Sequence, residues 1–331
     1  MKAFNVTKSD EGQTLIKYVS KLLSQAPMSV IHKALRKKNI DLNKKKASGK
    51  EIVKAGDIVQ IWFSDETFDK FLSTAEKHSS KNDSHVVSKK ELNEFKKNIL
   101  YEDDNVLFIN KWAGILTQQD DSDGASLNDV LLEYLSDMAK LRTVKPSICN
   151  RLDRNTSGIV VCGKTTKGLQ QMNEIIKDRS IHKYYRCLVY GKLQGEADLK
   201  AFLKKDSKSN TVKILDHEED NAYPIETIYK SLACFEIQGI PVSYLEVLLV
   251  TGRPHQIRAH LSSIGHPILG DTKYGNRDSI GVSDKLKVKR QLLHAFSLTL
   301  PRFKGEFASL SEKKIEAPLP NDIQTLLKNR R

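Results

Sequence analysis

The 331-residue sequence has few cysteines and no long apolar run. Its four cysteines, Cys149, Cys162, Cys187 and Cys234, lack the Cys-x-x-Cys spacing of a zinc site and suggest no disulfide framework. No stretch approaches the roughly 18 consecutive apolar residues that a membrane-spanning helix needs, and the first residues lack the apolar segment of a signal peptide. We therefore expect a cytoplasmic protein without a membrane anchor, whose cysteines pack as small core residues.

Acidic residues are also in short supply. Lys and Arg number 54 against 41 Asp and Glu, which gives a net charge of +13. The excess is concentrated at the start of the chain, where residues 1–50 contain twelve Lys or Arg and three Asp or Glu, a difference of +9. This balance favours a polyanionic partner, because lysine and arginine neutralise the phosphates of nucleic acids.

The most informative stretch is residues 148–164, which read Ile-Cys-Asn-Arg-Leu-Asp-Arg-Asn-Thr-Ser-Gly-Ile-Val-Val-Cys-Gly-Lys. Asp153 stands between Arg151 and Arg154, and a Thr-Ser-Gly turn then leads into an apolar run. This order predicts a polar loop, a tight turn and a buried strand. A carboxylate held among cations at the mouth of a strand stays ionised, so it can act as a nucleophile or a base. The charged letters alone would favour a solvated charge cluster that closes a turn at the surface.

The complete stretch resembles the motif His-Arg-Leu-Asp-x-x-Thr-Ser-Gly, which surrounds the catalytic aspartate of RNA pseudouridine synthases of the RluA type. Asn150 occupies the histidine position of that motif, and the other fixed letters are present. The resemblance implies that Asp153 is a catalytic carboxylate and that the chain isomerises uridine to pseudouridine in RNA. It also implies large-subunit ribosomal RNA as the substrate, with the target nucleotide flipped out of its helix.

The family's Lys-x-Tyr pattern occurs at residues 183–185, within a predicted strand over 181–191. This match implies that Tyr185 is the active-site tyrosine, which would stack on the detached base or remove its carbon-five proton. Strand alternation then puts Tyr184 on the opposite face. Without the match, a lone tyrosine in a strand would be read as a packing residue.

A third motif, Thr-Gly-Arg-Pro-His-Gln-Ile-Arg, occupies residues 251–258 and predicts a strand that leads into a helix. The resemblance implies that Arg258 pairs with Asp153, and Arg253 is the alternative partner. Later matches bring the resemblance to about residues 98–328, and they lie at 265–275, 293–295 and 315–320.

The first 63 residues read as a separate basic unit. Apolar spacing predicts helices over 12–24 and 30–38, the second capped by Ser29, followed by a lysine turn and a strand over 57–62. This order is similar to the small RNA-binding fold shared with ribosomal small-subunit protein four. On charge alone the unit could be a solvated basic face. The resemblance implies contacts with RNA phosphates from Arg36, Lys37, Lys38, Lys44, Lys45 and Lys46.

Further RNA contacts are expected beside the catalytic motifs, from Arg151, Arg154, Arg253 and His255. No metal site is indicated, because the histidines after residue 250 lack the His-Glu-x-x-His spacing. No cofactor is implied either, since the isomerisation neither adds nor removes a group. The expected partner is therefore RNA alone, bound by a monomer.

The chain divides into three parts on these observations: an RNA-binding module (1–63), a polar linker (64–97) and a catalytic domain (98–328). The fold class is α+β. The resemblance implies a mixed, mainly antiparallel sheet in the catalytic domain, and strand-like runs without regular βαβ spacing permit it. Helices are predicted over 126–139 and 165–177.

Two alternative functions have some support in the sequence. Asn150 and Trp112 depart from the family pattern, which expects histidine and proline there, so a catalytically inactive RNA-binding or ribosome-assembly factor is conceivable. An aspartate-nucleophile hydrolase would need a second carboxylate, and Asp271 follows the third motif. The sequence also leaves open how Asp153 acts, by attack on the base or the sugar or by removal of the 2′ proton.

Overall fold

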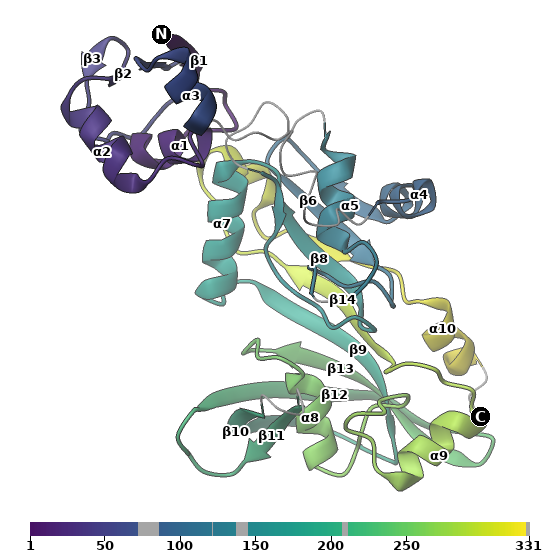
Figure 1. Ribbon diagram of the computed structural model, residues 1–331. Helices are drawn as coiled ribbons and strands as arrows, with labels where there is room; N and C mark the ends of the chain where they lie inside the picture. The colour runs from purple at the N-terminus through teal and green to yellow at the C-terminus, as the bar shows by residue number, and fades with distance from the viewer. Residues whose placement is uncertain (72–85, 121, 137–144, 207–210, 329–331) are drawn as a thin grey trace.

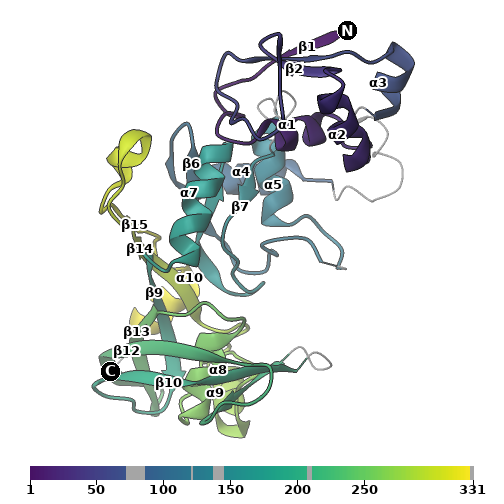
Figure 2. The same ribbon diagram turned by 90° about the vertical axis from the view of Figure 1, so that its left-hand side faces the viewer.

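The computed structural model describes the chain except for residues 72–85, 121, 137–144, 207–210 and 329–331. The N-terminal module contains a small four-stranded sheet, and the rest of the chain is built around an 11-stranded sheet (Figure 1). The N-terminal module lies at one end of the molecule. The strands of residues 196–206 and 222–237 lie at the other end (Figure 2).

The N-terminal module packs three helices against a sheet of order β1-β4-β2-β3. Its strands are β1 (Lys2–Asn5), β2 (Ile40–Leu42), β3 (Lys45–Lys46) and β4 (Ile58–Ile61). Its helices are α1 (Leu15–Leu22), α2 (Met28–Arg36) and α3 (Asp65–Phe71). Apolar side chains from all three helices enter one core, which explains how a unit of this size is stable on a two-layer plan.

Two local expectations for this module were wrong. The second helix begins after Pro27, so Ser29 lies in its first turn and caps nothing. Proline fixes a backbone angle that suits a helix start, which explains the earlier beginning. The lysine turn is a two-residue hairpin turn at Asn43 and Lys44, both with positive φ (52° and 64°), and the following two lysines belong to β3.

The expected polar linker also needs correction, because helices occupy both of its described ends. Phe68 of α3 is 1% exposed in the core of the N-terminal module. Helix α4 (Lys89–Lys97) begins with a capping box between Ser88 and Glu91 and buries Phe95 in the catalytic core. Both helices contain few apolar residues among many charged ones, so the sequence shows no clear helical period of apolar residues there. The centre of the expected linker, 79–84, lies outside the described residues.

The large sheet has the order β11-β10-β12-β13-β9-β14-β8-β6-β5, with β15 beside β14 and β7 beside β8. Among the described pairings, β8 with β14 is parallel and the others are antiparallel. This confirms the predicted fold class. The strands are β5 (Ile99–Glu102), β6 (Val106–Lys111), β7 (Ser147–Ile148), β8 (Ser157–Gly163), β9 (His182–Tyr190), β10 (Glu196–Asp206), β11 (Thr211–Leu215), β12 (Ala222–Ile237), β13 (Ile240–Leu249), β14 (Leu293–Thr299) and β15 (Lys314–Glu316).

Strand β8 is buried along its whole length because both faces of the sheet are covered there. Val160 points into a core shared with α4, α5 (Leu127–Tyr134) and α8 (Gln256–Ser263). Ile159 and Val161 point into a second core under α7 (Thr166–Lys177). A continuous apolar run rather than alternation is the sequence signature of such a strand.

Helices α9 (Arg277–Lys285) and α10 (Asn321–Lys328) pack in a core shared with β9, β12 and β13. The 3-10 helix η2 (Gly305–Leu310) instead packs in the core under α7. All four cysteines are free; two are buried and two are half-buried. Within the described residues, no helix is long and apolar enough to cross a bilayer.

The N-terminal module contacts the catalytic domain directly at the start of α7. The backbone N–H of Thr166 donates to the carbonyl of Ser9 at 3.1 Å. Lys167 forms ion pairs with Glu11 at 2.6 Å and with Glu306 at 2.8 Å. The two units thus contact each other directly where the module meets α7.

Candidate active site

Asp153 lies in the loop that enters β8, at the point where β8 meets β14. The N–H of Thr156 donates to the carbonyl of Asp153 at 3.0 Å and closes the turn. Gly158 follows with φ of +113°, and a Cβ at this position would lie 2.2 Å from the carbonyl oxygen of Ala295 on β14. Glycine is therefore required for the close parallel pairing that fixes where the loop ends.

The backbone of this loop is held by side chains from the turn after β6. The hydroxyl of Thr117 donates to the carbonyl of Leu152 at 2.6 Å and accepts from its N–H at 3.1 Å. Lys111 is 0% exposed, and its ammonium donates to the carbonyls of Trp112, Ile115 and Arg154 at 3.0–3.2 Å. Burial lowers the pKa of Lys111 to about 7, and the charge of the nearby Asp153 opposes this shift.

The other side of the loop is tied to the C-terminal helix. The guanidinium of Arg290 donates to the carbonyl of Asn155 at 3.0 Å and to both carboxylate oxygens of Asp322 on α10, at 2.7 and 2.9 Å. The neighbouring Gln291 donates to the hydroxyl of Thr156 at 3.4 Å. The loop that carries Asp153 is therefore fixed from two directions before any substrate arrives.

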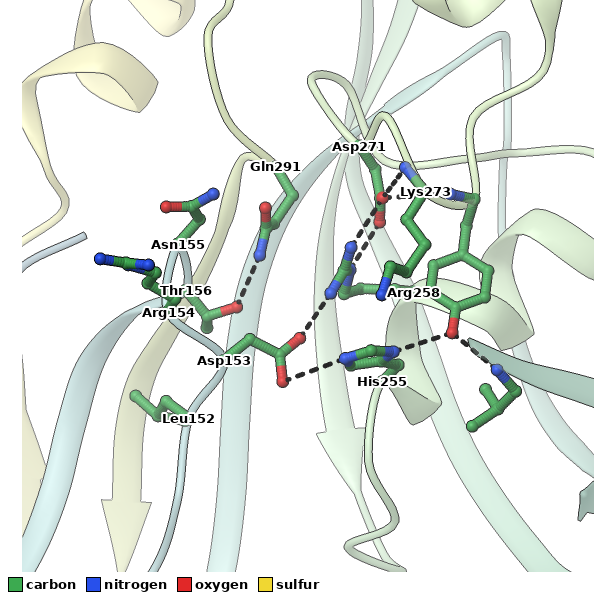
Figure 3. A network of polar contacts seen from close by, with 12 residues as sticks. Leu152, Asp153, Arg154, Asn155, Thr156, His255, Arg258, Asp271, Lys273 and Gln291 are labelled. Atoms are coloured by element: carbon green, nitrogen blue, oxygen red, sulfur yellow. Dashed lines mark hydrogen bonds and ion pairs between the residues drawn. The ribbon is translucent and has the colours of Figure 1, made fainter. Parts of the chain in front are cut away.

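Arg258 of α8 joins two carboxylates (Figure 3). Its Nη1 lies 2.7 Å from Asp153 Oδ2, and its Nε and Nη2 donate to Asp271 at 2.7 and 2.8 Å. Burial disfavours the charge on Arg258, but the two carboxylates outweigh it and raise the pKa of the guanidinium. The Asp271 side chain is fully buried, whereas that of Asp153 is 27% exposed. Only Asp153 thus has an accessible carboxylate in this chain of charges.

His255 is the second basic group beside Asp153, and its Nε2 lies 3.9 Å from Oδ1. Its backbone has φ of 54°, in the left-handed region, directly before α8. Its Nδ1 lies 2.8 Å from the hydroxyl of Tyr274, which accepts from the N–H of Val212 at 2.9 Å (Figure 3). Burial lowers the pKa of His255, with the charge of Asp153 opposing, so the ring is neutral at pH 7.

Tyr185 lies on β9, opposite Ala295 of β14, and is 6% exposed. Burial raises the pKa of its phenol, and the negative charge of Asp153 raises it further. The effect of Asp153 on this pKa means that the Tyr185 hydroxyl interacts electrostatically with the Asp153 carboxylate. Tyr184 is half-buried and is not part of the core cluster that contains Tyr185, as strand alternation requires.

The predicted basic contacts fall into two regions. All six in the N-terminal module are exposed. Two of them line a hollow of about 500 Å³, whose walls are His32, Leu35, Arg36, Lys46, Ala47 and Ser48. Near the site, Arg151 and Arg154 are exposed, and Arg154 also donates to the carbonyl of Gly114 at 3.1 Å. Arg253 stacks on Tyr223 and does not contact Asp153, so Arg258 is the partner that the fold provides.

Sequence reasoning missed the orienting role of Asp271. It considered this residue as the second acid of a hydrolase, but the carboxylate accepts from Arg258 and from the N–H groups of Lys273 and Tyr274. A fully buried carboxylate with these bonds cannot deliver a proton to a sugar. The buried Lys111 was also missed, since nothing in its local sequence distinguishes it from a surface lysine.

The two departures from the family pattern have structural roles. Asn150 accepts from the N–H of Val161 at 2.7 Å through Oδ1, and Trp112 packs against the catalytic core. The two other histidines of the third motif region have separate partners: His260 bonds to Thr227, and His266 bonds to the carbonyl of Tyr190. Within the described part of the chain, no three His, Cys, Asp or Glu side chains form a group suited to a metal ion.

Comparisons with known proteins agree with this geometry. A family model described as RNA pseudouridylate synthase matches residues 105–263. The ribosomal large subunit pseudouridine synthase C of Rickettsia conorii is 32% identical over 307 residues, covering 92% of this chain and 93% of the relative. The protein of the same name from Haemophilus influenzae is 30% identical, covering 90% and 86%.

Two solved human structures share the fold of the catalytic part. Human RNA pseudouridylate synthase domain containing 4 superposes with a TM-score of 0.57 at 22% identity, covering 72% of this chain and 94% of that one. Human RNA pseudouridylate synthase domain containing 1 gives 0.52 at 24% identity, covering 70% and 93%.

Proposed function

The chain belongs to the RNA pseudouridine synthase family and isomerises uridine in RNA, and we propose that large-subunit ribosomal RNA is its substrate and Asp153 its catalytic carboxylate. The observation that carries the second proposal is the 2.7 Å ion pair between Arg258 and the partly exposed Asp153. An ionised, oriented and accessible carboxylate is what the reaction needs.

The names and coverage of the relatives support the ribosomal substrate. Proteins named ribosomal large subunit pseudouridine synthase C match at about 30% identity over 90–92% of the chain. The exposed lysines and arginines of that module, which resembles the RNA-binding fold of ribosomal small-subunit protein four, would contact phosphates. Such contacts give affinity, while the shape of the RNA selects the uridine.

The proposed reaction is a rearrangement within one nucleotide. The bond from ribose carbon 1′ to ring nitrogen 1 breaks, and carbon 1′ bonds to ring carbon 5. The carbon-five proton leaves, and nitrogen 1 gains a proton, so atoms and electrons balance without an oxidant, a reductant or a hydrolytic water. Neither a cofactor nor a metal enters the proposal.

Asp153 can serve this reaction in three ways: it attacks the base, it attacks carbon 1′, or it removes the 2′ proton. Each of them requires the ionised form beside the sugar. Arg258 supports that form with a charge-assisted hydrogen bond. Lys111 and Thr117 reduce the mobility of the loop.

Tyr185 is proposed to stack on the detached uracil and to take part in transfer of the carbon-five proton. Its place in the core beside β14 supports a fixed ring orientation. When Asp153 is consumed by bond formation or protonation, its negative charge disappears and the pKa of the Tyr185 phenol falls toward its ordinary value. The hydroxyl thus becomes more acidic at the stage when the detached base must exchange protons.

The target nucleotide must leave its helix to reach this carboxylate. Arg151 and Arg154 are exposed on either side of Asp153 and are proposed to hold the flanking phosphates. Arg253 is proposed to extend the same basic rim, and His255 to contact the RNA as a neutral hydrogen-bonding group. We propose that the protein acts in the cytoplasm as a monomer.

The test compares ribosomal RNA from a strain that lacks the gene, with wild-type protein, Asp153→Asn or Asp104→Asn supplied back. Pseudouridines are mapped by carbodiimide treatment and primer extension. We expect one or more stops in large-subunit RNA to vanish on deletion and to return with wild type and Asp104→Asn, an exposed carboxylate in the turn before β6. Asp153→Asn should restore none of them while still binding RNA.

Two results would contradict parts of the proposal. Stops that persist on deletion would remove ribosomal RNA as the substrate, and transfer RNA would become the next candidate. Stops restored by Asp153→Asn would remove this residue as the catalytic carboxylate. Purified wild-type protein that binds RNA but forms no pseudouridine would favour the inactive assembly factor.

A further inference from the structure

An aromatic side chain is exposed at the start of β12, beside a cation without an acidic partner. Tyr223 is 48% exposed. The guanidinium of Arg253 lies 4.3 Å from the centre of its ring. No carboxylate lies within ion-pairing distance of Arg253 among the residues that the structure describes. The pair therefore combines a ring surface with free hydrogen-bond donors.

The stack is fixed to the rim of the active site. The N–H of Arg253 donates to Gln256 Oε1 at 3.1 Å, and Gln256 Nε2 donates to the carbonyl of Glu226 on β12 at 3.0 Å. Gln256 is buried, so this link between the turn and the strand of Tyr223 is protected from water. His255, two residues after Arg253, lies 3.9 Å from Asp153.

This combination has the chemistry of a nucleotide site. Unpaired RNA bases stack on aromatic rings and on arginine guanidinium planes, and phosphates accept hydrogen bonds from arginine. The flipped uridine itself must reach Asp153, whose side chain is 27% exposed and thus less accessible than Tyr223. Resting on the proposed function, we propose that Tyr223 and Arg253 bind the base and phosphate of a nucleotide flanking the target uridine.

Tyr223 and Arg253 bind the RNA and take no part in the chemical steps. Because the flanking base stays in place through the reaction, its contacts stabilise the bound substrate and the transition state equally. Losing them raises KM and leaves kcat near its original value. Stacking also tolerates any base, so the site positions the RNA without selecting its sequence.

The test measures the affinity of full-length protein for an unmodified transcript of large-subunit ribosomal RNA at fixed salt. We expect Tyr223→Ala to raise Kd, and KM for pseudouridine formation, by about 5- to 100-fold, the usual effect of losing one base stack. Tyr223→Phe should restore most of the lost affinity, because it keeps the ring. Leu232→Ala is the matched control, since Leu232 is 40% exposed on the same strand and distant in sequence from the stack.

Arg253→Ala tests the phosphate contact separately. It should weaken binding and reduce the slope of log affinity against log salt by about one unit. In the double variant the two effects should not add, since each side chain positions the other. An abasic nucleotide beside the target uridine should weaken binding by wild type and have little further effect on Tyr223→Ala.

Three outcomes would overturn the inference. They are a Tyr223→Ala affinity equal to that of Leu232→Ala, a Tyr223→Phe as weak as Tyr223→Ala, or a kcat loss with unchanged KM. Failure of the proposed function gives a different pattern: no pseudouridine from wild type, although Tyr223→Ala still weakens RNA binding.

Discussion

Asp271 holds Arg258 through both carboxylate oxygens, at 2.7 and 2.8 Å, across thirteen positions in the sequence. This fork fixes the guanidinium plane and directs Nη1 at Asp153. The carboxylate of Asp271 is in turn oriented by the N–H groups of Lys273 and Tyr274. The direction of the ion pair between Arg258 and Asp153 is therefore set by a fully buried residue.

Asp271→Asn should lower kcat by about 100-fold with little change in RNA affinity, because a misaligned guanidinium no longer aims Asp153. Losing one charge of a buried pair also costs about 3–5 kcal/mol of unfolding free energy. Single-turnover pseudouridine formation, filter binding and urea unfolding measure the three quantities. Glu246→Gln is the control, since it removes the ion-pair partner of Arg186, 2.8 Å away, and leaves Asp153, Arg258 and Asp271 unchanged. Full activity in Asp271→Asn would show that Arg258 needs no orienting partner.

Tyr185→Phe should lower kcat by at least about 100-fold while RNA affinity stays within a few-fold of wild type. The ring remains to stack on the base, but the hydroxyl that senses Asp153 is lost from proton transfer. Single-turnover assays with saturating protein separate the two effects. Tyr184→Phe, on the other face of the same strand, should behave as wild type. An active Tyr185→Phe would restrict this residue to stacking.

Lys111→Met should both destabilise the fold and slow the reaction. The substitution removes the Lys111 donor from the carbonyls of Trp112, Ile115 and Arg154, and leaving the buried Ile115 carbonyl unsatisfied costs about 1–3 kcal/mol. The Arg154 carbonyl, next to Asp153, keeps only the N–H of Gly114 as a donor. Urea unfolding and kcat at a temperature where the variant remains folded give the two effects. Lys97→Met, at the exposed end of α4, is the matched control. A folded variant with normal kcat would mean that the loop needs no support from Lys111.

Stability should fall as the pH drops from about 6.5 to about 4, in part because of His294. Burial lowers the pKa of this histidine from 6.5 to about 4, and its Nδ1 lies 2.9 Å from the hydroxyl of Ser157. Between these values the unfolded chain binds a proton that the folded chain does not, so unfolding is favoured as the pH falls. The contribution is at most about 3 kcal/mol and is fully present above pH 6.5.

The check is the difference between two urea titrations, wild type and His294→Gln, across pH 4 to 8. Carboxylates titrate in both proteins, so their contribution cancels when the two unfolding free energies are subtracted. The remaining gap between the curves reports the titration of His294. The gap should change mainly between pH 4 and 6.5 and be constant above. A gap that does not vary with pH would mean that His294 is not held neutral by the fold.

The sequence by itself determined the features that depend on local order. The apolar run after Asp153 predicted β8, the strand-like run that ends at Gly191 predicted β9, and apolar spacing predicted the helix of residues 166–177. These elements follow from patterns within a dozen residues, and the family motifs lie on them. The expected mixed, mainly antiparallel sheet is confirmed for the same reason, since the motifs identify the fold as well as the chemistry.

Only the tertiary structure decided which distant residues act together. The 64–97 segment reads as polar, yet Phe68 and Phe95 enter two different cores, because burial depends on what the rest of the chain brings to them. Asp271 could not be recognised as the orienter of Arg258, nor Tyr223 as the partner of Arg253, from spacing alone. Side-chain direction and dielectric environment arise when strands and helices pack, and these set the partner and the charge of every group in the site.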